Sequence, residues 1–102
     1  MEPPSNTPFR VGGTVREPKK ISDVRPVYPA IAQAAKVEGM VILEAVINER
    51  GTVERVRVLR SVPLLDAAAV EAVRNWRYTP TLLNGTPVSV LMTITLHFTL
   101  HD

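Results

Sequence analysis

Residues 88–100 read Val-Ser-Val-Leu-Met-Thr-Ile-Thr-Leu-His-Phe-Thr-Leu, the most regular pattern in this 102-residue chain. Every second residue from Val88 to Leu100 is apolar, and most of the residues between them carry a hydroxyl group. This period of two predicts a long β-strand with one buried face. No Lys, Arg, Asp or Glu interrupts the stretch. If the strand lies at the edge of a sheet, its outer backbone groups are open either to aggregation or to docking of an added strand.

Two further strands precede this stretch. Residues 40–48 are apolar on both faces, which is typical of a strand in the middle of a sheet. Glu49-Arg50-Gly51 predicts a hairpin turn into a second strand at 53–60, where valines alternate with arginines. We therefore predict an antiparallel three-stranded sheet of order 2-1-3. The charges of the second strand protect one edge, so the open edge belongs to the third strand.

Two helices complete the predicted fold. Residues 65–76 change to a helical period, with Trp76 on the apolar stripe and therefore expected in the core. Pro29 at a first helical position and Gly39 after the last one predict a short helix over 30–36. Asn84-Gly85 favours a type I′ turn before the last strand. The predicted fold class is thus α+β, with a three-stranded antiparallel sheet and two helices.

The N-terminal part differs in composition from the rest. Six of the nine prolines lie in the first 29 residues, where apolar periodicity is absent. We expect residues 1–20 to form a flexible linker and residues 21–102 to form one domain. The chain opens without the pattern of a signal peptide, and no apolar run reaches the ~20 residues of a membrane helix. We therefore expect a soluble chain that makes no membrane contact itself. A soluble fragment of a longer, membrane-anchored protein would show the same pattern.

Composition argues against several function classes. The net charge of 12 − 10 = +2 is small for a nucleic-acid binder, and no aromatic row accompanies the arginines at 55, 57 and 60. The chain has no cysteine, and its few acids and two histidines offer no nucleophile with an obvious base. His97 and His101 would lie about 13 Å apart along a strand, too far for one metal ion. We expect no enzyme activity, no cofactor and no metal.

Several motifs together resemble a known family. They are Arg25-Pro26-Val27-Tyr28-Pro29, Ala32 and Gly39, Asn48-Glu49-Arg50-Gly51-Thr52-Val53, Ser61, Leu65-Asp66-Ala67-Ala68, and Asn75-Trp76-Arg77-Tyr78-Thr79-Pro80. The combination resembles the C-terminal domain of TonB-family energy transducers over residues 25–100. In well-known members a Gln-Pro-x-Tyr-Pro pattern contacts the transporter, and Arg25 stands here in the place of the Gln.

The resemblance implies a non-enzymatic periplasmic adaptor. Members of the family carry a cytoplasmic-membrane helix and a proline-rich spacer ahead of this domain, and they work with ExbB and ExbD. Their final strand accepts the TonB-box peptide of an outer-membrane transporter by strand addition, and the spacer carries a pull driven by the proton-motive force. For this chain the resemblance implies the soluble end of such an inner-membrane protein, acting in substrate uptake.

The open edge and the resemblance together define the candidate partner-binding residues. They are Arg25, Tyr28, Ser89, Val90, Leu91, Met92, Thr93, Ile94 and Thr95. The alternative for Tyr28 is packing beside the sheet, which would fix the N-terminal segment rather than contact a partner. The alternative function is self-association, in which the same edge pairs with its twin in a homodimer. A persistent dimer that excludes peptide would favour this alternative, whereas a monomer that takes up TonB-box peptides would favour the adaptor.

Overall fold

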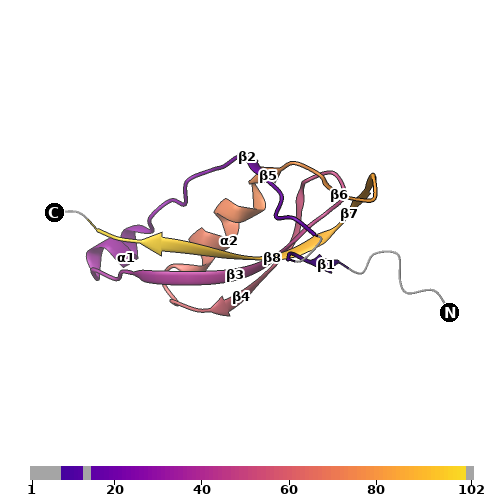
Figure 1. The fold of residues 1–102 in the computed structure, drawn as a ribbon. Helices are drawn as coiled ribbons and strands as arrows, with labels where there is room; N and C mark the ends of the chain where they lie inside the picture. Colours follow the sequence, from indigo (N-terminus) through magenta and orange to yellow (C-terminus); the bar gives the residue numbers. More distant parts are fainter. Residues whose placement is uncertain (1–7, 13–14, 101–102) are drawn as a thin grey trace.

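The computed structural model describes residues 8–12 and 15–100 (Figure 1). Two helices and eight strands follow one another along these residues. They are β1 (Phe9–Arg10), β2 (Lys20–Ser22), α1 (Ala30–Ala34), β3 (Gly39–Ile47), β4 (Val53–Arg60), α2 (Asp66–Arg74), β5 (Arg77–Tyr78), β6 (Thr81–Leu83), β7 (Thr86–Val88) and β8 (Val90–Phe98). The α+β class and the two predicted helices are confirmed.

The main sheet has the order β1-β8-β3-β4. β3 pairs antiparallel with both β4 and β8, so the predicted order 2-1-3 of the three principal strands is confirmed. Its pairing with β8 is regular from Gly39 opposite Phe98 to Ile47 opposite Val90. β3 is central because its residues are apolar on both faces, and nearly all of its second half is buried.

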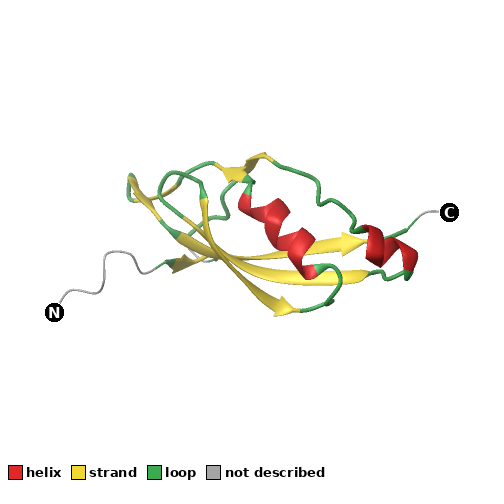
Figure 2. Cartoon of the chain, turned by 180° about the vertical axis from the view of Figure 1, so that it is seen from behind, coloured by secondary structure: helices red, strands yellow, loops and turns green. Residues whose placement is uncertain are grey.

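The core lies between one face of this sheet and α2. Figure 2 shows α2 crossing that face. The helix buries Ala69, Ala72 and Val73, and its packing contacts are with β4 and β3. From the sheet, Val41, Leu43, Ala45 and Ile47 of β3 meet Val90, Met92, Ile94, Leu96 and Phe98 of β8 in one apolar cluster. The alternating sequence pattern of β8 therefore identified its buried face correctly.

The prediction of only three strands was wrong in two ways. β1 adds a fourth strand to the main sheet, and two small sheets, β2-β5 and β6-β7, lie outside it. The last strand is also shorter than the predicted 88–100. β8 ends at Phe98, opposite Gly39, where β3 begins, and Val88 belongs instead to β7, opposite Thr81. These additional strands have two or three residues each, too few for a recognisable period.

Part of the predicted linker packs on the domain. Val15 is 7% exposed and belongs to the core cluster. The Lys19 backbone amide donates to the Thr79 hydroxyl oxygen at 3.0 Å, and the Thr79 amide donates to the Lys19 carbonyl oxygen at 2.8 Å. These contacts attach the segment to the chain that follows α2. Residues 1–7 and 13–14 lie outside the described residues, and a domain boundary at residue 20 stays a prediction.

Two turns require unusual backbone conformations. Asn84 and Gly85 have φ of +53° and +79°, and they connect β6 to β7 as the predicted type I′ turn would. Gly51, between β3 and β4, has φ of +84°. A Cβ added at Gly51 would lie 1.9 Å from the Tyr78 carbonyl oxygen, and the Tyr78 amide donates to the Gly51 carbonyl oxygen at 2.9 Å. Only glycine allows this approach of the two backbones.

Candidate functional site

The outer edge of β8 is defined by the direction of its backbone groups. The carbonyl oxygens of Ser89 and Leu91 accept hydrogen bonds from β1, so they point away from β3. Because the backbone groups of successive strand residues point to opposite sides, those of Thr93, Thr95 and His97 also point outward. Beyond Leu91, no strand among the described residues pairs with this edge. The open part of the edge therefore runs from Thr93 to His97.

The side chains of the predicted site residues divide between the two faces of the sheet. Val90, Met92 and Ile94 are at most 8% exposed and point into the core, so their side chains are not available to a partner. Thr93 and Thr95 are exposed on the opposite face, and Leu91 is half-buried there. Ser89 is buried at the junction between β7 and β8. The candidate site is thus mainly backbone, flanked by hydroxyl and aliphatic groups.

The prediction that this edge is open along its whole length was wrong. β1 pairs with β8 in parallel, with Phe9 opposite Val90 and Arg10 opposite Leu91. The Phe9 amide donates to the Ser89 carbonyl oxygen at 2.9 Å, and the Val11 amide donates to the Leu91 carbonyl oxygen at 3.3 Å. Both residues of β1 are exposed and give no periodic signal. Residues 9–11 can be assigned to the site only from their backbone pairing with β8, which is far away in the sequence.

Tyr28 lies at the other end of β8. Its ring meets Phe98 edge to face, with centroids 5.5 Å apart and planes at 86°, and its hydroxyl donates to the Val37 carbonyl oxygen. Partial burial, and then the Glu38 carboxylate, raise the pKa of the Tyr28 phenol. The alternative of packing beside the sheet is confirmed. Arg25 is exposed in the loop between β2 and α1.

Trp76 holds the loop that contains Arg25 at its other end, at Val24. The ring is 7% exposed, and its Nε1 donates to the Val24 carbonyl oxygen at 2.9 Å. The Lys20 ammonium lies 3.7 Å from the ring centroid and 3.1 Å from the Asp23 carboxylate. Trp76 is therefore a core residue, as its place on the helical stripe predicted, and it positions the loop that contains Arg25.

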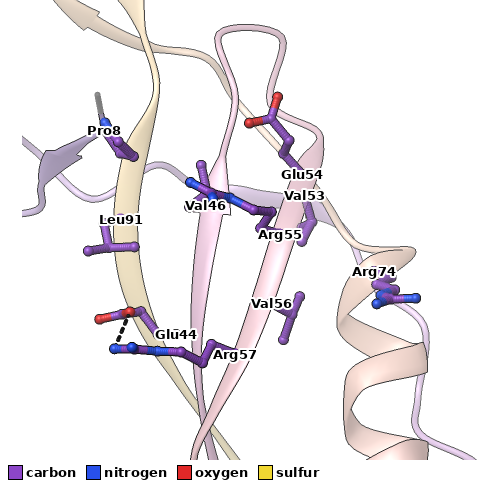
Figure 3. Close-up of a pocket in the computed structure, with 10 residues that line it drawn as sticks. All are labelled: Pro8, Glu44, Val46, Val53, Glu54, Arg55, Val56, Arg57, Arg74 and Leu91. Carbon is purple, nitrogen blue, oxygen red and sulfur yellow. Dashed lines mark hydrogen bonds and ion pairs between the residues drawn. The ribbon is translucent and has the colours of Figure 1, made fainter. Parts of the chain in front are cut away.

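The opposite edge of the sheet is charged. Figure 3 shows Arg55 and Arg57 of β4 extending over the sheet face, with Arg57 paired to Glu44 of β3 at 2.9 Å. A hollow of about 720 Å³ runs around this strand. Its lining comes from β3, β4, β8, α2 and the residue before β1: Pro8, Glu44, Val46, Val53, Glu54, Arg55, Val56, Arg57, Arg74 and Leu91. The exposed charges of β4 discourage strand pairing there, which leaves β8 as the more suitable edge.

The described residues contain no group of three or more His, Cys, Asp or Glu side chains that could hold a metal. His97 is exposed on β8, and His101 lies outside the described residues. Within the described part of the chain, neither helix has the length and apolar character needed to span a bilayer.

Sequence comparisons show which known proteins the chain resembles. Residues 24–100 match the family described as Gram-negative bacterial TonB protein C-terminal. The chain is 34% identical over 89 residues to Protein TonB of Vibrio cholerae, which is 84% of this chain and 36% of that protein. It is 35% identical over 65 residues to Protein TonB of Escherichia coli, covering 62% of this chain and 27% of that protein. The chain thus spans about a third or less of the length of these relatives.

Two solved structures have the same fold. The solution NMR structure of the Pseudomonas aeruginosa TonB CTD superposes with a TM-score of 0.71 at 28% identity, covering 91% of this chain and 94% of that one. The TonB2 protein of Vibrio anguillarum gives a TM-score of 0.63 at 26% identity, with both chains fully covered. The family match covers both helices and the three principal strands, and the chain therefore belongs to the TonB C-terminal family.

Proposed function

We propose that this chain is a non-enzymatic periplasmic adaptor, which binds the TonB-box peptide of outer-membrane transporters by strand addition to β8. The observation that carries the proposal is the open edge from Thr93 to His97. It presents unpaired outward backbone groups among the described residues, and β8 contains no Lys, Arg, Asp or Glu. Strand addition takes its affinity from main-chain hydrogen bonds, so an uncharged edge of this kind suits it.

The pairing of β1 supports the same use of the edge. A parallel strand already fits against Ser89 and Leu91 without disturbing the register between β8 and β3. A strand running on in the same direction would meet the outward groups of Thr93 and Thr95. The side chains of Leu91, Thr93 and Thr95 would then flank the added peptide on the face opposite α2 and contribute to specificity.

We assign a second, smaller contact to the segment around Arg25. Its neighbours Val24 and Val27 are 45% and 80% exposed, so apolar surface accompanies the cation. Tyr28 and Trp76 hold the segment at its two ends through their bonds to Val37 and Val24. A held segment loses little conformational freedom on binding, which favours a specific contact.

The remaining roles belong to a full-length protein of this family. We assign the contacts with ExbB and ExbD to a part of the protein that precedes this domain. We assign transmission of energy from the proton-motive force to the segment that connects that part with this domain. The domain would then act in the periplasm, as the soluble end of a protein anchored in the inner membrane. Its contribution is to hold a transporter while the rest of the protein delivers energy for substrate uptake.

An amide NMR titration with synthetic TonB-box peptides tests the proposal. We expect chemical-shift changes concentrated at Thr93–His97 and in the loop containing Arg25. Sedimentation of the free chain at micromolar concentration should show a monomer. A dimer that excludes the peptides would instead support self-association through the same edge. Shifts confined to β4 or α2 would place docking elsewhere and contradict the proposal.

A further inference from the structure

β1 occupies backbone groups that an added strand would need. Phe9 and Val11 use the outward carbonyl oxygens of Ser89 and Leu91, which are the first acceptors along the outer edge of β8. Figure 1 shows β1 beside the start of β8. A peptide that paired with the full length of β8 would therefore compete with this chain's own residues for the same acceptors.

β1 itself makes few contacts with β8, although the next residue, Val11, is partly buried against the core. β1 has two residues, both exposed, and Phe9 is 43% exposed. The Phe9 and Val11 amides donate to β8 at 2.9 and 3.3 Å, and each backbone bond of this kind contributes roughly a 2- to 10-fold factor to the docking equilibrium. The cost of ordering the segment offsets part of that gain. A strand held in this way can be displaced by a better competitor.

The pairing of the segment with β8 ends directly after β1. Gly12 has φ of +133°, and it exchanges backbone hydrogen bonds with Val15 at 2.7 and 3.0 Å instead of bonding to β8. A hollow of about 280 Å³ lies at this point, lined by Arg10, Val11, Glu17, Leu91, Met92 and Thr93. The end of β1 thus adjoins the open part of the edge, where an incoming strand could begin to pair before displacing β1.

We infer that residues 8–11 are an intramolecular competitor for the outer edge of β8, which lowers the apparent affinity of the domain for an added strand. The inference rests on the proposed function. The apparent dissociation constant is the intrinsic one divided by the fraction of molecules in which the edge is free. Removing β1 from the edge should therefore tighten binding, by about 3- to 10-fold once the cost of ordering the segment is set against its backbone bonds.

A matched pair of proline variants in the full chain tests the inference. Phe9→Pro removes an amide that donates to β8, whereas the amide of Arg10 points away from β8 because strand residues alternate. The probe is a synthetic TonB-box peptide, and the readout is its dissociation constant. We expect Phe9→Pro to bind about 3- to 10-fold tighter than the unmodified chain, and Arg10→Pro to bind within about twofold. Phe9→Ala, which keeps the amide, controls for loss of the ring.

A disulfide provides the opposite perturbation. The chain has no cysteine, and Arg10 and Leu91 are direct partners on neighbouring strands. Neighbouring strands lie about 4.8 Å apart, within the Cα range that a disulfide bridges. The Arg10→Cys, Leu91→Cys variant should bind the peptide at least about tenfold more weakly when oxidised than when reduced.

The outcomes separate the two proposals. Equal affinity of Phe9→Pro and the unmodified chain, or of the oxidised and reduced double variant, overturns the competition and leaves the adaptor function intact. Absence of peptide binding in the unmodified chain, in Phe9→Pro and in the reduced double variant overturns the adaptor function and the competition with it. Tighter binding by Phe9→Pro together with weaker binding by the oxidised variant supports both.

Discussion

Replacing Trp76 by alanine should remove most of the stability of this domain. The ring is 7% exposed, donates one hydrogen bond to the Val24 carbonyl oxygen and lies beneath the Lys20 ammonium. Burial of about 200 Å² at about 25 cal/mol per Å² contributes about 5 kcal/mol as an upper estimate. The hydrogen bond adds about 1 kcal/mol. Residual burial by the alanine and relaxation of the site bring the expected cost to about 3–5 kcal/mol.

Thermal unfolding followed by circular dichroism measures this effect. For a domain of this size, each 1 kcal/mol shifts Tm by about 4–8 °C, so Trp76→Ala should lower Tm by at least about 12 °C. Trp76→Phe is the matched control, since it keeps an aromatic ring and most of the apolar area but loses the N–H donor. Its cost should be about 1–2 kcal/mol. Normal melting of Trp76→Ala combined with lost peptide binding would refute the reasoning and make Trp76 a contact residue.

Three further predictions concern stability. Gly51→Ala should lower the free energy of unfolding by roughly 3 kcal/mol or more, because a Cβ there would lie 1.9 Å from the Tyr78 carbonyl oxygen and φ is +84°. A free energy of unfolding within about 1 kcal/mol of the unmodified chain, measured by chemical denaturation, would contradict this prediction. Burial, and then the nearby acids, raise the pKa of Tyr78 to about 12 in the folded state, so stability should be complete below about pH 10 and fall by about 1–3 kcal/mol as pH rises toward 12. Urea unfolding of Tyr78→Phe should show a smaller fall, because Tyr28, whose pKa is also raised, remains. Deleting residues 1–12 should change Tm by only a few degrees. Deleting residues 1–20 should lower Tm much further, because it also removes buried Val15 and the pairing of Lys19 with Thr79. Equal Tm values for the two truncations would show that residues 13–20 add no stability.

The sequence predicted the elements whose side chains have a long, uninterrupted period. β3, β4, β8 and α2 each have eight or nine residues, and their apolar spacing identified both the elements and their buried faces. The double-sided apolar pattern of β3 was enough to place it at the centre of the three principal strands. β1, β2 and β5 are held by backbone pairs between segments far apart in the sequence, and two or three residues carry no period.

The candidate site was predictable in part for the same reason. The uncharged, alternating residues 88–100 pointed to β8 as a docking edge, and Asn84-Gly85 supplied the turn before it. The coverage of Ser89 and Leu91 by residues 9–11 depends on the backbone amides of Phe9 and Val11, which composition and periodicity do not reveal. The extended setting of Tyr28 before Pro29 suggested packing beside the sheet, but its partner Phe98 required the structure. The direction of the backbone groups of β8 required the structure.

The most direct measurement is the affinity of a TonB-box peptide for the unmodified chain, Thr93→Pro and Thr93→Ser, each followed by amide NMR in the full chain. The amide of Thr93 points outward from β8, so proline should leave the sheet folded and remove one donor from the docking edge. Thr93→Ser keeps that donor and most of the side chain. We expect Thr93→Pro to weaken binding by at least about fivefold, from about 1 kcal/mol or more for the lost bond and the added clash, and Thr93→Ser to bind within about twofold. Unchanged affinity of a folded Thr93→Pro variant would contradict docking at this edge and direct the search to the segment around Arg25 and Tyr28.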